Sequence, residues 1–164
     1  MEIRKLEKND LQIRIDLLNN PLVSKGLNVN ETFNLSQTLL WFEKNQTNKT
    51  RFDCVFTIND EIVGMGGLSN ISSLDSNASL YIYLSPQYWG CGNGTKALKL
   101  LCEYGFKNLK LNKIYLYTFA NNIRANKLYE KIGFKLEGVL REHTMHNGKL
   151  NDRYMFGLLK TEFK

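Results

Sequence analysis

Proline and cysteine are scarce in this sequence, and long apolar runs are missing. Only 2 of its 164 residues are proline and 3 are cysteine. The odd cysteine count, with no metal-like spacing among Cys54, Cys91 and Cys102, argues against a disulfide framework and a cysteine-built metal site. No segment approaches the roughly 18 successive apolar residues that a membrane helix needs. We therefore expect reduced thiols, no metal and no membrane partner.

Acidic residues are outnumbered, which restricts the ligands this chain can bind. Lysine and arginine total 22 against 16 acids, giving a net charge of +6 that favours an anionic ligand. The aromatic–basic interleaving and helix-turn-helix spacing of nucleic-acid-binding domains are missing, so no nucleic-acid partner is expected. The charged segment 1–10 does not resemble a signal peptide, and a cytoplasmic location follows as an expectation.

The length and the hydrophobic share of 43% predict one globular domain over residues 1–164. Alternating patterns predict strands at 2–6, 52–58, 62–69, 78–84, 114–119, 134–145 and 150–159. Helical spacing predicts helices from Leu11 to a stop at Pro21, from about Asn34 or Ser36 to Phe42, and over 94–109 and 122–132. Pro21 and Pro86 are interpreted as breaks between elements.

The order of these elements predicts the fold class. Asn59-Asp60 and Asn147-Gly148 are typical of tight hairpin turns, which join antiparallel strands. The two helices after residue 90 connect strands, so part of the sheet is expected to be parallel. Gly64, Gly66 and Gly67 indicate a bulge or a close backbone approach. The prediction is an α/β fold, a mixed twisted sheet of about seven strands with helices on both faces.

A glycine-rich loop follows the strand at 78–84 and precedes a helix. Glycines let successive N–H groups converge, and the helix start adds its own unpaired donors and positive dipole end. Such a loop can hold a pyrophosphate. The order Gly94-Thr95-Lys96 differs from a phosphate-binding Walker loop, and no acid ends the strand at 114–119, as a dinucleotide fold would require. A plain strand–helix turn remains the alternative.

Two motifs carry a family resemblance. The Gln-x-x-Gly-x-Gly pattern from Gln87 to Gly92 resembles the acetyl-CoA loop of the GCN5-related N-acetyltransferases. Asn122-x-x-Ala125-x-x-Leu-Tyr129-x-x-x-Gly-Phe resembles the second signature of that family, and the strand order agrees over nearly the whole chain. The resemblance implies the GNAT fold, acetyl-CoA as co-substrate and a small-molecule amine as acceptor.

The resemblance also implies roles for individual residues. The strand end Ile82-Tyr83-Leu84 would bulge, splay from 114–116 and pair with the pantetheine arm, while the Leu84 N–H would face the oxyanion. Tyr129 would protonate the leaving thiolate, although a core tyrosine is the alternative. Asn122 would bond the arm and Ala125 would leave room for it. The pyrophosphate would bind the loop, which comprises Gln87, Tyr88, Trp89, Gly90, Cys91, Gly92, Asn93, Gly94 and Thr95.

The proton acceptor is not evident from the sequence. Many members of the family carry a glutamate in the strand before the loop, but 78–81 has no carboxylate. Ser79 or Tyr81 at the start of a water chain, Glu142, and His143 are the alternatives, and a lone histidine is more often structural. Cys91 lacks a neighbouring base, which argues against an acyl-cysteine route.

The acceptor pocket is expected between the first two helices and the last two strands. Segment 27–33 and Tyr83 belong to this expectation, and the candidate side chains are Trp41, Ser79, Tyr81, Arg141 and His143. Trp41 packing in the core is the alternative.

The helix segment 39–44 resembles that of enzymes acting on nucleotide-linked amino sugars, and the basic charge favours such an anionic acceptor. The amino group of a nucleotide-activated sugar is therefore the first choice. The alternatives are the N-terminus of a ribosomal protein, a polyamine such as spermidine, and a CoA-binding sensor without turnover. The long final strands leave an edge that a homodimer would cover.

Overall fold

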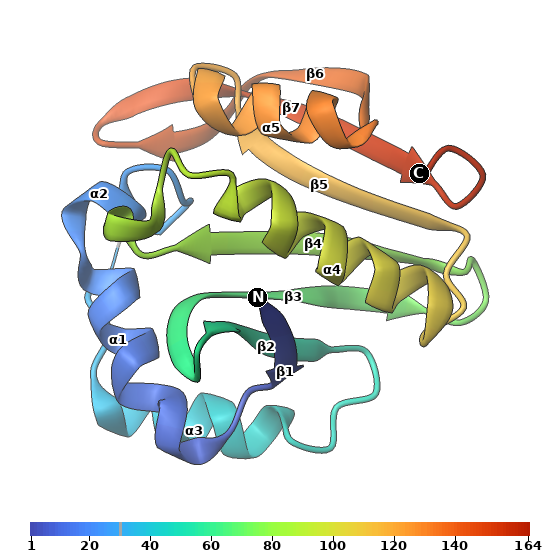
Figure 1. Cartoon of the computed structure of the whole chain (residues 1–164). Coiled ribbons are helices and arrows are strands. Elements are labelled where there is room, and N and C mark those ends of the chain that lie inside the picture. The colour runs from blue at the N-terminus through green and yellow to red at the C-terminus, as the bar shows by residue number, and fades with distance from the viewer. Residues whose placement is uncertain (30) are drawn as a thin grey trace.

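The computed structural model describes residues 1–29 and 31–164 and contains a seven-stranded mixed sheet of order β1-β2-β3-β4-β5-β7-β6 (Figure 1). The strands are β1 (Glu2–Lys5), β2 (Phe52–Ile58), β3 (Glu61–Ser72), β4 (Asn77–Leu84), β5 (Lys113–Phe119), β6 (Lys135–His146) and β7 (Lys149–Leu159). The helices are α1 (Leu11–Asn19), α2 (Pro21–Ser24), α3 (Leu35–Asn45), α4 (Asn93–Lys107) and α5 (Ile123–Ile132). The predicted α/β class is confirmed.

Helices cover both faces of the sheet because its strands alternate apolar side chains between two clusters. Helices α4 and α5 lie on one face (Figure 1), and the first cluster joins Leu98 and Leu101 of α4 to Phe56, Leu80 and Leu84. The second cluster lies on the opposite face and joins α1 and α2 to the sheet through Leu11, Leu18, Val23, Val55, Met65 and Tyr83. No helix among the described residues is long and apolar enough to cross a membrane.

One pair of strands separates partway along its length. Strands β4 and β5 run parallel and pair only at Asn77–Lys113, Ala78–Ile114 and Ser79–Tyr115, after which they diverge (Figure 1). On its other side β4 stays in register with β3 as far as Gly64–Leu84. The predicted splay is confirmed, because residues 114 and 115 pair with 78 and 79 and no residue of 82–84 pairs with β5. The predicted bulge is wrong, since residues 82–84 stay in regular register with β3.

Local chemistry explains the predicted hairpin turn and also the helix α2, which the sequence interpretation missed. Asn147 and Gly148 have φ values of 51° and 71° and close the β6–β7 hairpin, as predicted. Helix α2 begins at Pro21, which was interpreted only as a break. Proline is favoured at the first helical position because its missing N–H is not needed there. The Asn20 side chain accepts from the Leu22 N–H at 2.9 Å and caps this helix.

Gly133 ends α5 in a conformation that disfavours any other residue. Its φ is 108°, and its N–H bonds back to the helix carbonyls. We expect Gly133→Ala to lower the free energy of unfolding by about 1–2 kcal/mol, because a Cβ is strained in the left-handed region. Gly138→Ala is the matched control, since a Cβ there meets open space. Denaturant titration of both variants checks this, and equal stability would contradict it.

Candidate active site

The glycine loop ends at the start of α4 in the geometry of an anion site. Gly90 and Gly92 have φ values of 83° and 77°, and Gly92 is the N-cap of α4. No described side chain caps the first turn of α4, so the backbone N–H groups of that turn remain available. These donors and the helix dipole can hold a pyrophosphate. The loop residues from Gln87 to Thr95 therefore suit the predicted role.

Side chains anchor the loop on both sides. The Trp89 indole N–H donates to the Leu84 carbonyl at 2.9 Å, and the Asn93 amide donates to the Tyr88 carbonyl at 3.2 Å. The Arg124 guanidinium lies 4.5 Å from the centre of the Trp89 ring, which places a cation beside the loop. Sequence reasoning missed Arg124, because only the packing of α5 against the loop brings it there.

Strand β4 presents different chemistry on its two faces. Leu80, Ile82 and Leu84 pack toward α4, whereas Tyr81 and Tyr83 pack toward α3 and α1. Beyond Ser79 the strand has lost its β5 partner, so a backbone edge faces the divergence. A linear ligand with amide groups can pair with such an edge as an added strand.

Helix α5 places the predicted thiolate acid near the divergence. The Asn122 side chain accepts from the Ala125 N–H at 3.3 Å and caps α5, and its Nδ2 lies near Gly26. Tyr129 is buried, with its ring 5.9 Å from that of Phe134. Burial raises the pKa of Tyr129 to about 12, although the nearby Arg153 acts in the opposite direction. Tyr129 therefore keeps its proton at neutral pH.

Trp41 and Tyr81, two of the predicted acceptor residues, come together around a pair of arginines. Arg14 lies 4.0 Å from the centre of the Trp41 ring, and Arg51 lies 5.5 Å from it and 5.9 Å from the Tyr81 ring. Sequence reasoning missed the carboxylate of this group, Asp53, which bonds both Arg51 and Tyr81. Ser79 lies on the same strand as Tyr81 and is half-buried.

The other predicted acceptor residues lie elsewhere. Arg141 and His143 are exposed on β6, where they line a surface cavity of about 800 Å³ with Asp152. Glu142 has a φ of 50°, and its N–H donates to Asp152 at 2.7 Å, so this stretch bulges out of the hairpin. Trp41, Ser79 and Tyr81 do not line this cavity.

A second cavity, of about 490 Å³, lies where the end of α1 and the residues Val29, Glu31 and Thr32 meet the β6–β7 turn. Glu31, Thr32, Met145 and Asn147 are among its lining residues, so part of the predicted segment 27–33 faces the final hairpin. Asn30 belongs to the predicted segment but lies outside the described residues. Cys91 is exposed in the glycine loop, whereas Cys54 and Cys102 are buried.

The glycine loop yields a direct test of the anion site. We expect Gly92→Ala to raise the dissociation constant of CoA about tenfold, because a Cβ at φ 77° forces the helix start to shift by a strained backbone change of about 1–2 kcal/mol. Isothermal titration measures this affinity. Gly133→Ala introduces similar strain away from the loop and serves as the control, and an unchanged CoA affinity in Gly92→Ala would contradict the assignment.

Comparisons with known proteins agree with this geometry. Residues 1–135 match the family model described as an acetyltransferase (GNAT) domain. An uncharacterized N-acetyltransferase, p20 of Bacillus licheniformis, is 30% identical over 99% of this chain and 94% of its own length. The spermidine N(1)-acetyltransferase of Escherichia coli K12 is 30% identical over 91% of this chain and 80% of its own length.

A solved structure extends the match to three dimensions. The spermidine N-acetyltransferase of Vibrio cholerae, in complex with CoA and spermine, superposes with a TM-score of 0.94 at 25% identity. The match covers 98% of this chain and 96% of that protein. The chain therefore belongs to the GNAT family and is an acetyl-CoA-dependent N-acetyltransferase.

Proposed function

We propose that the chain acetylates a primary amine of a polyamine such as spermidine. The observation that carries this choice is the match over nearly the full length to spermidine acetyltransferases from two organisms. It replaces the nucleotide-linked amino sugar as the first candidate. The cavity beside the β6–β7 turn, which contains the carboxylate-bearing residue Glu31, offers a place for part of a long cationic amine.

The proposed mechanism assigns a task to each part of the chain. The N–H groups of Gly92 to Thr95 hold the pyrophosphate of acetyl-CoA, and the edge of β4 beyond Ser79 pairs with the pantetheine arm. The acceptor amine attacks the thioester carbonyl directly. The Leu84 N–H stabilises the oxyanion, and the Tyr129 hydroxyl donates the proton that the departing thiolate needs.

A nucleotide-linked amino sugar stays as the second candidate because of the charges around Trp41. Arg14 and Arg51 flank this ring, and Asp53 is the carboxylate bonded to that group. Two guanidiniums beside an aromatic ring suit an anionic acceptor with a planar nucleobase, whereas they repel a polycation.

The homodimer predicted through the final strands also stays a proposal. Its supporting features are the edge position of β6 and the exposed apolar side chains Leu136, Val139 and Met145.

The acceptor is tested by following thiol release from acetyl-CoA with a panel of amines. The panel contains spermidine, a nucleotide-linked 4-amino sugar, an N-terminal peptide and an aminoglycoside. We expect spermidine to give the highest kcat/KM. Faster turnover of the amino sugar would transfer the assignment to the second candidate, and CoA binding without turnover of any amine would favour a sensor.

Tyr129 yields a prediction about pH as well as rate. We expect Tyr129→Phe to lower kcat by about 100- to 1,000-fold, which is within the range for loss of a general acid, with little change in CoA affinity. Because the pKa of Tyr129 is raised to about 12, its acid form persists between pH 6 and 9, and the loss should be the same across that interval. Tyr104→Phe is the control, and a loss that varies strongly within that pH interval would contradict the acid role.

A further inference from the structure

The acceptor side of β4 provides hydroxyl groups but no carboxylate. Its sequence from Asn77 to Leu84 contains neither Asp nor Glu. An alkylammonium with a pKa near ~10 must lose a proton before or during its attack on a thioester. A group that accepts this proton is therefore needed near the point where β4 leaves β5.

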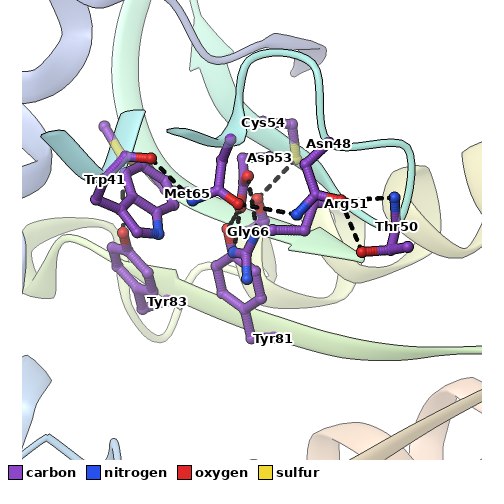
Figure 2. Close-up of polar contacts among 11 residues, drawn as sticks. Trp41, Asn48, Thr50, Arg51, Asp53, Cys54, Met65, Gly66, Tyr81 and Tyr83 are labelled. Carbon is purple, nitrogen blue, oxygen red and sulfur yellow. Dashed lines mark hydrogen bonds and ion pairs between the residues drawn. The ribbon is translucent and has the colours of Figure 1, made fainter. Parts of the chain in front are cut away.

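The pairing of β2, β3 and β4 brings the Asp53 carboxylate close to Tyr81. Asp53 of β2 lies opposite Gly67 of β3, and Gly67 lies opposite Tyr81 of β4. A Cβ on Gly67 would stand 2.7 Å from the Tyr81 hydroxyl oxygen, so only glycine leaves room for the ring to cross β3. The Tyr81 hydroxyl donates a short hydrogen bond to Asp53 (Figure 2).

Asp53 is held on its other side by an arginine. Arg51 donates to both carboxylate oxygens of Asp53, at 2.7 Å from Nη2 and 3.2 Å from Nε. The side chains of Asp53 and Arg51 are only 12% and 25% exposed, so this pair is shielded from bulk water. The bidentate contact fixes the carboxylate in the direction of Tyr81.

The charged and titratable groups around Tyr81 keep its proton in place at rest. Asp53 of β2 and Arg51, the residue just before β2, contact Tyr81. Cys54 and Tyr83 lie beside it, and Arg14 of α1 acts on Tyr83. Burial, followed by the negative charge of Asp53, raises the pKa of Tyr81 well above its ordinary value. Tyr81 is therefore a neutral phenol that donates to Asp53 and still has an oxygen lone pair that can accept.

The position of Tyr81 along β4 connects this unit to the reaction. Tyr81 lies two residues beyond the last β4–β5 pair, at Ser79, and three residues before Leu84. It thus lies on the segment whose edge faces the divergence. Trp41, which Arg51 also contacts, lies on the same side of the sheet. Tyr83 instead directs its hydroxyl to the Met65 sulfur at 3.7 Å (Figure 2).

We propose that Tyr81 is the catalytic proton acceptor of this acetyltransferase, and that Asp53 is the positioning residue that receives the proton of Tyr81 in turn. One N–H bond of the acceptor ammonium breaks and a new O–H bond forms on Tyr81, which leaves the amine nitrogen with the lone pair that then bonds to the acetyl carbon. At the same time the original O–H bond of Tyr81 breaks and Asp53 becomes a carboxylic acid, which returns its proton to water. The proposal rests on acetyl transfer to an amine and not on which amine is accepted.

Tyr81→Phe and Asp53→Asn test this relay. Each variant removes one step and keeps the shape of its side chain. We expect kcat at pH 7 to fall about 100-fold in each, as for the loss of a general base, while the CoA dissociation constant changes less than about threefold. We also expect the deficit to shrink to about tenfold by pH 9.5, because more of the acceptor amine then arrives without its extra proton.

Two control variants make the same substitutions, Tyr to Phe and Asp to Asn, at positions away from the proposed relay. Tyr104→Phe removes a tyrosine hydroxyl from α4, the helix that packs on the other side of the sheet. Asp10→Asn breaks another bidentate pair, in which Arg4 donates to Asp10 at 2.7 and 2.9 Å. Both controls should keep kcat within about threefold of the unmodified protein. If Asp53→Asn does not fold, Tyr81→Phe decides alone, because it leaves the Arg51–Asp53 pair in place.

The acceptor used is whichever amine of the panel the unmodified protein turns over fastest. Failure of spermidine as an acceptor would therefore leave this experiment valid. The proposal is overturned if Tyr81→Phe retains kcat within threefold at pH 7. It is also overturned if the deficit stays constant from pH 7 to 9.5, since a purely structural tie between β4 and β2 predicts that result.

Discussion

Strands β4 and β5 pair at only three positions and then separate, while each stays bonded to its outer neighbour. Strand β3 follows β4 as far as Leu84, and β7 follows β5 as far as the Phe119–Arg153 pair. The divergence therefore does not depend on a weakened sheet. Backbone N–H and C=O groups that lose a strand partner need another partner. The pantetheine arm of the co-substrate has the amides to supply it, and the glycine loop begins where β4 ends.

The two faces of β4 have different roles in the site. On one face Leu80 and Leu84 pack against α4, which fixes the strand relative to the helix start that can hold the pyrophosphate. On the other face Tyr81 reaches across Gly67 to Asp53, so the groups proposed to handle protons are two strands apart. The same strand thus sets the distance between the co-substrate and the proton acceptor. The two arginines beside Trp41 make this face more cationic than a polycationic acceptor would favour.

Features with local causes could be predicted from the sequence, and features made by strand order could not. The Asn147-Gly148 turn, the glycine loop and the helix predicted over 122–132 each depend on residues close together in the sequence. Helix α2 was missed because Pro21 is equally typical of a break and of a first helical position. Asp53 lies 28 residues before Tyr81, and only the β2-β3-β4 order, with a glycine between them, brings the two side chains together. Arg141 and His143 were predicted to line one pocket with Trp41 and Tyr81, but at the bulge in β6 they line a cavity that those two residues do not reach, and their role toward the acceptor stays a prediction.

The claim that the β4–β5 divergence and the glycine loop form one co-substrate site is tested most directly by amide hydrogen exchange with and without CoA. We expect CoA to slow amide exchange at residues 80–84 and at residues 90–95 together. Because these segments lie on either side of the loop residues 85–89, protection of both marks an arm that runs from the loop along the strand edge. Saturating CoA that protects neither segment, or that protects the β6–β7 hairpin instead, would contradict it.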